Sequence, residues 1–475
     1  MAPIPFPFTS SPGNRPQDSA GRLINCHYAL LPAGARAQGK WRRSPGLRRF
    51  AESAQTGHRG HIIVGSTLYA AFASNVTRFD RAGAATSVGV LDGTSRVFWA
   101  RNNRLPTPDL VVVDPDNGAS VVSASSVAPY PDSDVGAPNS VCFLDGYFFF
   151  TYGNGACIAS ALNSTEIDPL ANIKCEGNPD GLLRAVPFRD LYLAGSATIE
   201  VWRNTAEPPR AFPFSRVSVI PRGILSRHAI AGFEDGVGKG IVFVGNDKRV
   251  HVLEGYTPTP ISTLDVDRAI ASFLETGGDP NAIEMFAYVI DGHACIVMQC
   301  PAWAWVFDLD TFYWHERASY LSPTWRATGA VNAFGTWIAG DTRSGDLLEI
   351  SEFARDELGD PLVFQLESGP VTAFPGRAAV AHASFDVMQS VGIATGSDPT
   401  QSDPTLFISY SPDGGETWSP PRARKLGRQG ARPQAIKVTR CGSLGPAGRR
   451  WRLTVSDPVD VEVFGGDQSA EIRTA

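Results

Sequence analysis

Short apolar runs separated by tight polar turns recur along most of the chain. Between Asn139 and Thr205, two pairs of such runs turn at residues 144–147 (Leu-Asp-Gly-Tyr) and 188–191 (Phe-Arg-Asp-Leu). An Asp-Gly pair between apolar runs favours a β-hairpin, because glycine accepts the positive φ that a two-residue turn requires. The pattern therefore predicts antiparallel hairpins in this stretch.

The same unit, a strand followed by a Gly, Asp or Asn turn and a partner strand, repeats along the chain. Successive units begin near residues 61, 109, 141, 183, 241, 285 and 331. Their spacing scatters around roughly 45 residues, as in the four-stranded blades of a β-propeller. No short motif such as Trp-Asp is shared between units, so the prediction rests on rhythm. We predict an all-β protein with a multi-bladed β-propeller body over residues 61–360.

One segment inside this body has helical spacing instead. Val266, Ile270 and Phe273 form an apolar stripe within residues 264–275, and either Thr263 or Asp265 is placed to cap the first turn. We predict a helix there, and another short helix over residues 351–358.

Both ends of the chain differ from the repeating region. Residues 1–35 mix proline with serine and glycine, which predicts an extended arm or a frayed terminus. A basic segment completes a first region over residues 1–60. From about residue 361, apolar and polar residues alternate, which predicts a separate, sandwich-like antiparallel β domain over residues 361–475.

Composition narrows the class of protein. The chain has 475 residues and a formal charge of −6, which argues against a protein that coats nucleic acid over its whole surface. The sequence contains no run of 18 apolar residues, so it predicts no transmembrane helix, and its first residues lack the pattern of a secretory signal. The seven cysteines are scattered without a C-x-x-C pair, so we expect buried free thiols and no zinc site.

Two basic clusters stand out against the acidic whole. Three interpretations remain open: weak contact with a passing phosphate backbone, pairing with acidic surfaces of neighbouring subunits, or a solvated face. The residues concerned are Arg42, Arg43, Arg48 and Arg49 in the first cluster, and Arg422, Arg424 and Lys425 in the second.

Residues 411–418 (Ser-Pro-Asp-Gly-Gly-Glu-Thr-Trp) match an Asp-box hairpin. Asp413 can accept backbone N–H groups, and Gly415 supplies positive φ, between Ser411 and Trp418. This predicts a structural turn. Sialidase-like propellers also carry Asp boxes, which leaves a glycan-cleaving or glycan-binding propeller as the alternative. No G-x-S-x-G, P-loop or H-E-x-x-H motif is present, so we expect no catalytic residue, cofactor or metal.

The segment NPDGLLRAVPFRDLYLAGSATIEVWRNT resembles the packaged-DNA stabilisation proteins of short-tailed phages, also called tail accessory factors or tail-hub (nozzle) proteins. Weaker echoes follow in the family's order at Ser-Pro-Gly 44–46, Val-Phe-Asp 306–308, Leu-Phe-Ile-Ser 406–409 and Trp-Arg-Leu-Thr-Val 451–455. The Pro-rich start and the Asp box are not part of this pattern. The matching residues of the main motif are Pro179, Asp180, Gly181, Arg189, Asp190, Gly195, Thr198, Ile199 and Glu200.

This resemblance implies a non-enzymatic structural protein of the virion tail, made and assembled in the bacterial host cytoplasm. Family members form a homo-oligomeric ring of six copies below the portal and its head-to-tail adaptor protein. The ring continues the DNA channel and helps to retain the packaged genome, with transient, non-specific DNA contact. The resemblance also implies that the ring carries a tailspike, fibre or tail needle.

Overall fold

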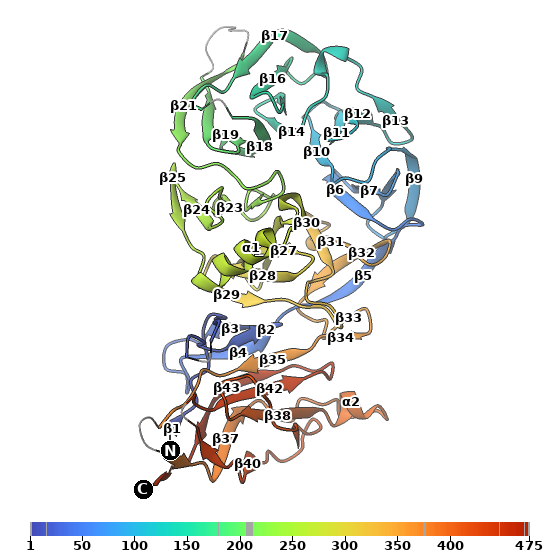
Figure 1. Cartoon of the computed structure of the whole chain (residues 1–475). Helices are drawn as coiled ribbons and strands as arrows, with labels where there is room; N and C mark the ends of the chain where they lie inside the picture. The colour runs from blue at the N-terminus through green and yellow to red at the C-terminus, as the bar shows by residue number, and fades with distance from the viewer. Residues whose placement is uncertain are drawn as a thin grey trace. The chain divides into compact units, whose positions relative to one another are not determined.

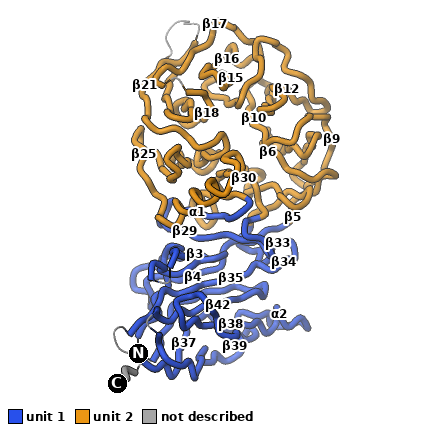
Figure 2. Tube along the Cα trace, in the orientation of Figure 1, with its two compact units in different colours: residues 1–48, 301–325, 351–475 blue, residues 49–300, 326–350 orange. Residues whose placement is uncertain are grey.

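The computed structural model describes residues 2–15, 17–178, 180–205, 212–373, 377–445, 447–469 and 471–473. The described chain consists mainly of short strands (Figure 1). It divides into two compact units (Figure 2). Unit 1 contains residues 1–48, 301–325 and 351–475, and unit 2 contains residues 49–300 and 326–350. Within the described residues, neither α-helix has the length and hydropathy that a membrane span requires.

Unit 2 contains five four-stranded antiparallel sheets in which neighbours in sequence are neighbours in space. The first three consist of β6 (His58–Val64), β7 (Thr67–Phe72), β8 (Asn75–Phe79), β9 (Ala85–Val90); β10 (Phe98–Arg101), β11 (Leu110–Asp114), β12 (Gly118–Val122), β13 (Val127–Pro129); and β14 (Ser140–Leu144), β15 (Tyr147–Thr151), β16 (Ala156–Ser160), β17 (Ile167–Lys174). The next two consist of β18 (Leu182–Phe188), β19 (Asp190–Gly195), β20 (Ile199–Asn204), β21 (Phe214–Ile220); and β22 (Ile230–Ala231), β23 (Val242–Val244), β24 (Val250–Glu254), β25 (Thr257–Pro260).

Two further sets of strands complete unit 2. The hairpin of β26 (Glu284–Ile290) and β27 (His293–Cys300) follows β25 in the chain. The last sheet places β30 (Ala327–Ala333), β31 (Thr336–Asp341) and β32 (Asp346–Ser351) beside β5 (Gly46–Glu52), which precedes all the others in sequence. The N–H of Ser53 donates to the carbonyl of Gly345 at 2.8 Å, so a strand from the beginning of unit 2 closes a sheet built from its end.

The inner strands of these sheets follow one another around a ring, as Figure 1 shows. Strand β6 contacts β10, β10 contacts β14, β14 contacts β18, β22 contacts β26, and β26 contacts β30. Buried Val186, Ile230 and Phe243 belong to one cluster that joins the sheets of β18 and β22. Strand β30 contacts β6, which closes the ring. The predicted β-propeller is confirmed for unit 2.

The predicted hairpin and the first predicted helix are also confirmed. Asp145 and Gly146 have φ values of 49° and 93° between β14 and β15, as the Asp-Gly turn requires. Helix α1 (Leu264–Glu275) begins after Thr263, whose side chain accepts the N–H of Val266. The short 3₁₀ helices η1 (Ser133–Val135) and η2 (Pro280–Ala282) lie in connections.

The second predicted helix, over residues 351–358, is wrong. These residues finish β32 and form β33 (Asp356–Glu357), which pairs with β34 (Asp360–Pro361). Leu358 and Gly359 both have positive φ, near 58° and 90°, so the chain makes a tight turn where a helix would continue.

Unit 1 combines strands from both ends of the chain. One sheet runs β3-β4-β43-β37-β40, another runs β2-β35-β42-β38-β39, and a small one runs β41-β36-β44. Its remaining elements are β28 (Trp303–Asp308), β29 (Tyr313–Glu316) and α2 (Pro399–Ser402). The sheet strands are β2 (Arg22–Ile24), β3 (Cys26–Leu30), β4 (Gly39–Arg43), β35 (Phe364–Glu367), β36 (Arg377–Ala379), β37 (His382–Val387), β38 (Thr405–Ser411), β39 (Arg422–Lys425), β40 (Ile436–Thr439), β41 (Ser443–Leu444), β42 (Arg450–Val455), β43 (Glu462–Gln468) and β44 (Glu471–Arg473).

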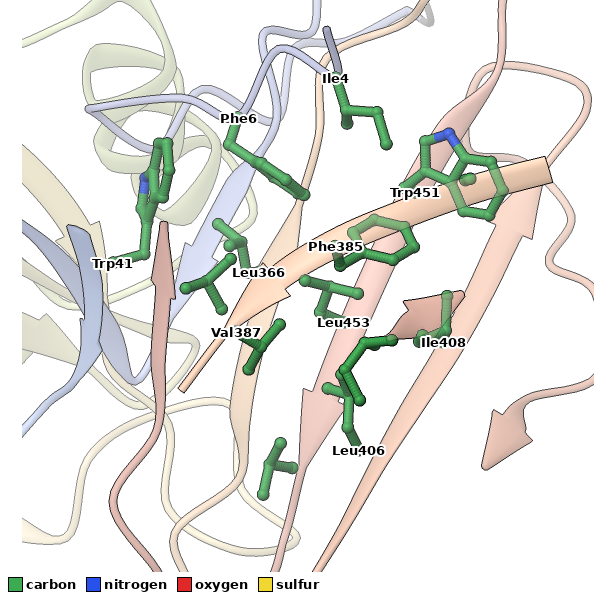
Figure 3. Packing of buried hydrophobic residues seen from close by; sticks show 14 of the residues in the cluster. Ile4, Phe6, Trp41, Leu366, Phe385, Val387, Leu406, Ile408, Trp451 and Leu453 are labelled. Atoms are coloured by element: carbon green, nitrogen blue, oxygen red, sulfur yellow. The ribbon is translucent and has the colours of Figure 1, made fainter. Parts of the chain in front are cut away.

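One hydrophobic cluster takes side chains from both of the large sheets of unit 1. Figure 3 shows Phe385 of β37 beside Leu453 and Trp451 of β42. The Trp451 ring lies 5.4 Å from that of Phe385, and its indole N–H donates to the side-chain oxygen of Gln468 at 2.8 Å. Trp451 is fully buried, so it anchors this core.

The Pro-rich start packs into unit 1 and is not an extended arm. Ile4 and Phe6 are 5% and 7% exposed and belong to the cluster shown in Figure 3. Strand β1 (Ala2–Pro3) pairs with β43, and the N–H of Ile4 donates to the carbonyl of Gly466 at 2.8 Å. The two apolar side chains alternate with prolines, so they can face a core while the prolines occupy positions that need no N–H donor.

Candidate functional site

Arg43 of the first basic cluster is buried within unit 1. Its guanidinium donates to the carbonyls of Val455, Asp457 and Val459 at 2.8–2.9 Å. Burial is the main cause that lowers the pKa of Arg43, to about 10. Trp41 and Arg43 share the inward face of β4, so this arginine supports a chain turn and its guanidinium is not presented to DNA.

The other members of the first cluster are divided between the units. Arg42 is half-buried on β4, and exposed Arg48 donates to the carbonyl of Phe353 at 3.1 Å in unit 1. Arg49 belongs to unit 2, where it forms ion pairs with Asp346 at 3.0 Å and Glu52 at 3.4 Å. Arg43 is buried and Arg42 is half-buried, so the four residues do not form a patch of four exposed cations.

The second basic cluster lies on β39, the last strand of its sheet. Arg424 Nε donates to the carbonyl of Lys437 at 2.8 Å, and Arg422 donates to the carbonyl of Thr439. Both acceptors belong to β40, the end strand of the other large sheet of unit 1. Lys425 instead forms an ion pair with Asp403 at 3.3 Å. Arg422 and Arg424 therefore cover backbone groups that an edge strand would leave open.

The Asp box forms the predicted turn after β38. Ser411 donates to Asp413 at 2.6 Å, and the N–H of Thr417 donates to the Asp413 carboxylate at 2.9 Å. Burial tends to raise the pKa of Asp413, but hydrogen bonds from Ser411 and Thr417 outweigh it and hold that pKa well below its usual range. The guanidinium of Arg452 lies 3.7 Å from the centre of the Trp418 ring. Ser411, Asp413 and Thr417 therefore bind one another within the turn.

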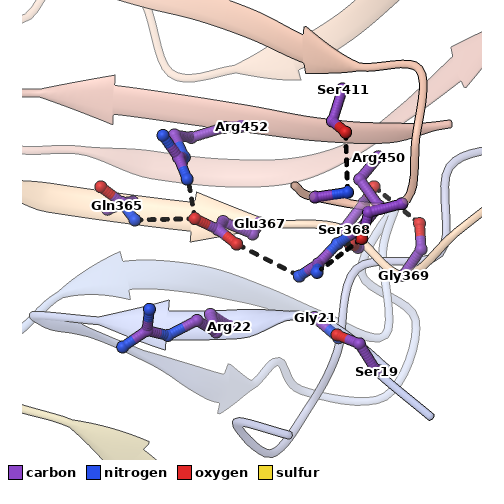
Figure 4. A network of polar contacts seen from close by, with 12 residues as sticks. Ser19, Gly21, Arg22, Gln365, Glu367, Ser368, Gly369, Ser411, Arg450 and Arg452 are labelled. Atoms are coloured by element: carbon purple, nitrogen blue, oxygen red, sulfur yellow. Dashed lines mark hydrogen bonds and ion pairs between the residues drawn. The ribbon is translucent and has the colours of Figure 1, made fainter. Parts of the chain in front are cut away.

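A carboxylate network lies close to this turn in unit 1. Glu367 accepts Arg452 at 2.8 Å, Arg450 at 3.1 Å and the Gln365 amide at 2.8 Å (Figure 4). Arg450 also donates to the Gly414 carbonyl inside the Asp box at 3.2 Å. Two of the ten arginines and lysines around residues 422–452 therefore neutralise a buried carboxylate.

The motif residues 180–200 stabilise a turn in unit 2. Asp180 accepts the N–H groups of Ala197 and Thr198, the latter at 3.1 Å, ahead of β20. Glu200 accepts the N–H of Gly177 at 2.8 Å. Both carboxylates therefore tie the connection before β18 to the hairpin after it. Pro179 lies outside the described residues.

Asp190 of the same motif ends the β18–β19 turn. Its carboxylate binds the guanidinium of Arg203 through two hydrogen bonds of 2.7 Å and accepts the Tyr256 hydroxyl at 2.9 Å. Hydrogen bonding by Arg203 is the largest cause that lowers the pKa of Asp190. Arg189, with φ near 62°, takes the turn position. The motif is architectural, since each described carboxylate satisfies groups of unit 2 itself.

A cavity of about 510 Å³ lies where the inner strands of unit 2 converge. Residues of β6, β10, β14, β18, β26 and β30 line it, together with the segment around β22. The sequence does not reveal this site, because its polar residues lie on three strands, β6, β18 and β26, and on segments beside β10 and β22, without a shared motif. Those that carry its chemistry are His58, His61, Arg96, Arg184, His228, Glu234 and Glu284.

Arg96 and Glu284 form an ion pair in this cavity. Arg96 also donates to the Thr328 hydroxyl at 2.7 Å, and that hydroxyl donates to Glu284 at 3.0 Å. Gln299 donates to the other oxygen of Glu284 at 2.6 Å. Burial lowers the pKa of Arg96 to about 10. Both oxygens of Glu284 are therefore bound by Arg96, Thr328 and Gln299, whereas the side-chain oxygen of Gln299 is buried without a hydrogen-bond partner in the described chain.

His58 and His61 form a second polar pair, between β6 and the sheet that closes the ring. His61 Nε2 lies 3.1 Å from the carbonyl of Ile338 and must donate to it, so His61 Nδ1 accepts Nε2–H of His58 at 2.7 Å. Burial lowers the pKa of His61 to about 4, and burial followed by His61 and Arg96 lowers that of His58 well below 6.5. Both rings are therefore neutral at pH 7.

The third group in the cavity is arranged differently. Arg184 has its guanidinium carbon 4.9 Å from the ring centres of both Phe98 and Phe233. His228 stacks on Phe98 at 5.3 Å with an interplanar angle of 9°. Glu234 accepts the N–H groups of Gly232 at 2.6 Å and Ala287 at 3.0 Å.

Unit 2 is thus a β-propeller in which the motif carboxylates Asp180, Asp190 and Glu200 bind groups of the same unit. A family model described as "Bacteriophage P22 Gp10, beta-propeller" matches residues 22–352. The chain belongs to this family of phage stabilisation proteins, which are structural proteins of the virion. The resemblance seen in the sequence is thereby confirmed.

Solved structures with similar folds include the WD40 β-propeller domain of Doa1, with a TM-score of 0.41 and 12% identity over 64% of this chain and 96% of that one. The WD40 repeats of RRP9 have a TM-score of 0.43 and 11% identity, over 65% of this chain and 99% of that one. No curated protein matches this chain.

Proposed function

We propose that this protein is the tail hub, or nozzle, of a short-tailed phage. Copies of the chain form a six-membered ring below the portal and its adaptor protein, continue the DNA channel, help to retain the packaged genome and anchor tailspikes or fibres. The observation that carries the proposal is the family match over residues 22–352, together with the collinear motif around Asp180 and Glu200. A ring of copies lets many weak contacts act together on the adaptor.

We infer a non-enzymatic role. The Asp-box carboxylate accepts hydrogen bonds from Ser411 and Thr417, and the motif carboxylates are bound to their own turns. The alternative, a glycan-cleaving propeller, has a direct test. Hydrolysis of a fluorogenic sialoside by the purified chain would favour it over the structural role.

The experiment that tests the hub is removal of the chain from the virion by a stop codon in its gene. We expect heads to fill and then lose DNA, which buoyant density and nuclease sensitivity of the genome both measure. Supplying the wild-type chain in the same cells should restore full particles. Full, infectious particles without the chain would contradict the proposal, as would a single copy in the assembled tail.

Substitutions of exposed basic residues test the proposed contact with DNA. Arg48→Gln combined with Lys425→Gln removes two exposed cations while leaving buried Arg43 in place. We propose that these particles lose their genome faster than wild type, with a smaller difference at high salt, because phosphate contacts weaken as salt rises. The matched control is Arg81→Gln, an exposed arginine in the turn between β8 and β9. Equal retention in both variants would exclude these residues from DNA contact.

A further inference from the structure

The cavity of unit 2 has the size and lining of a small-molecule site. Its volume of about 510 Å³ lies within the range of roughly 300–1,000 Å³ that is usual for ligand pockets. Apolar side chains, including Trp99, Phe143, Met285 and Phe286, form much of its wall. A mostly apolar wall with a few convergent polar groups is the usual composition of such sites. The polar groups then decide which ligand fits.

Arg184 is a cation of the cavity lining that forms no ion pair within the described residues, although the charge of nearby Glu234 acts on it. Its one hydrogen bond within the described residues runs to the carbonyl of Arg227 at 3.2 Å, and none of their carboxylates forms an ion pair with it. Arg96, by contrast, is paired with Glu284. A guanidinium has five N–H donors in a planar fork. Held between Phe98 and Phe233, that fork keeps a fixed orientation and most of its donors stay unused.

His228 adds a neutral donor beside this cation. Its ring lines the cavity, and its nitrogens have no hydrogen-bond partner within the described part of the chain. Burial, followed by Arg96, Arg184 and Arg227, lowers the pKa of His228 well below 6.5. Three guanidinium groups therefore act on one neutral imidazole, which marks this part of the cavity as electropositive.

The charge of Glu234, an acidic residue of the lining, acts on Arg184, but each acidic group of the lining binds other groups or faces solvent. Glu284 is occupied by Arg96, Thr328 and Gln299. Glu234 directs its two oxygens to the backbone N–H groups of Gly232 and Ala287. Asp145 and Asp235 are exposed to solvent. An anion is thus the ligand that would complete the hydrogen bonding of Arg184.

We propose that this cavity binds a small organic carboxylate with an apolar body. The carboxylate accepts from the guanidinium fork of Arg184 and from the ring N–H of His228. Its apolar body lies against the aromatic wall. A planar carboxylate matches the arginine fork through two parallel hydrogen bonds, whereas an inorganic anion would leave the apolar wall in contact with water. This site is a property of one chain and is independent of the hub proposal.

The test uses the full-length chain and 4-fluorobenzoate, with binding followed by the ¹⁹F signal of the probe. We expect saturable binding, and we expect Arg184→Gln to weaken it by about tenfold or more, because a charge-assisted pair is lost. Arg81→Gln is the matched control and should leave binding within about twofold, since Arg81 is exposed outside the cavity. The neutral isostere 4-fluorobenzamide should bind at least about tenfold more weakly than the carboxylate.

A second variant guards against loss of folding. Arg184→Lys keeps the positive charge but not the fork, so it should fold like wild type by circular dichroism and still bind 4-fluorobenzoate several-fold more weakly. Three results would overturn the proposal: no saturable binding of 4-fluorobenzoate by the wild-type chain, equal binding by folded Arg184→Gln, or equal binding of the benzamide. Inorganic phosphate competing as well as 4-fluorobenzoate would also overturn it, since the apolar body would then contribute nothing.

Discussion

Unit 2 and unit 1 are both built from short strands, but they pair those strands in opposite ways. In unit 2, β6, β7, β8 and β9 pair in the order in which they occur, and the following four sheets repeat this. In unit 1, β1 and β4 both pair with β43, and β2 pairs with β35. Local pairing leaves a rhythm in the sequence, whereas pairing across hundreds of residues leaves none.

Buried arginines take two kinds of partner, and both kinds occur in unit 1, where Arg450 binds the buried carboxylate of Glu367 at 3.1 Å. In unit 2, Arg59 meets the buried carboxylate of Asp114 at 2.6 Å, and Arg326 binds that of Asp341 at 2.6 Å. In unit 1, Arg43 donates to backbone carbonyls. An arginine in a sequence therefore does not reveal its partner, and a cluster of arginines need not form a surface patch.

Deletion of residues 2–24 should have the largest effect on stability among the changes that test this difference in strand pairing between the two units. It removes β1 and β2 and the buried side chains of Ile4, Phe6 and Leu23. Loss of each large buried side chain costs about 2–5 kcal/mol, against a total stability of about 5–15 kcal/mol for a domain. We expect unit 1 to lose its cooperative unfolding transition in calorimetry, and its peptides to become protease-sensitive.

The point variant Phe6→Ala provides a graded version of the same test. It should lower the unfolding free energy by about 3–5 kcal/mol while keeping the backbone of β1. The matched control is Phe8→Ala, since Phe8 is 46% exposed two residues away. Unchanged unfolding after the deletion would show that the segment is an arm after all.

The same contrast explains what could be predicted from the sequence. Five of the seven expected unit starts, 61, 141, 183, 285 and 331, fall on inner strands, and the other two, 109 and 241, fall beside β11 and β23. The Asp-Gly turn at Asp145 and the helix capped by Thr263 follow from local chemistry alone. These features need only neighbouring residues, so a pattern within about 15 positions is enough.

The rest depends on contacts between distant residues. Nothing near Arg43 in the sequence indicates that carbonyls at positions 455–459 surround it. Likewise, the cavity takes Arg184 from β18 and Arg96 and His228 from segments just before β10 and β22, and each looks like an isolated polar residue in the sequence. The Asp box is the exception, because Ser411, Asp413 and Thr417 satisfy one another within one turn.

A smaller, pH-dependent effect should separate the units. Unit 2 buries His58, His61 and His228 with lowered pKa values, whereas in the described part of unit 1 His315 has its pKa lowered to about 3 by burial and then by Arg317. In the unfolded chain each imidazole has a pKa near 6.5. Below that value the unfolded state binds more protons, so stability is full above pH 6.5 and falls as the pH drops toward 4.

We expect hydrogen exchange at pH 7, 6 and 5 to show a larger loss of protection in unit 2 than in unit 1. Protonated His58 would face both His61 and Arg96, which adds repulsion to the cost of burial. The double variant His58→Gln with His61→Gln should reduce the acid dependence of unit 2, and His382→Gln in unit 1 is the control. Equal loss of protection in the two units would exclude these histidines as its cause.

The smallest effect concerns the Asp-box turn, whose carboxylate, Asp413, accepts hydrogen bonds from residues of the same turn, although it lies in the unit built from distant strands. Asp413→Asn keeps the shape of the side chain but removes the charge that strengthens its bonds from Ser411 and Thr417. We expect the unfolding free energy to fall by about 1 kcal/mol, measured by urea denaturation, with no change in genome retention. Glu416→Gln, in the same turn, is the control. A loss of several kcal/mol would mean that the turn holds the Glu367 network together through Arg450 and Gly414, so that even this local motif depends on distant contacts.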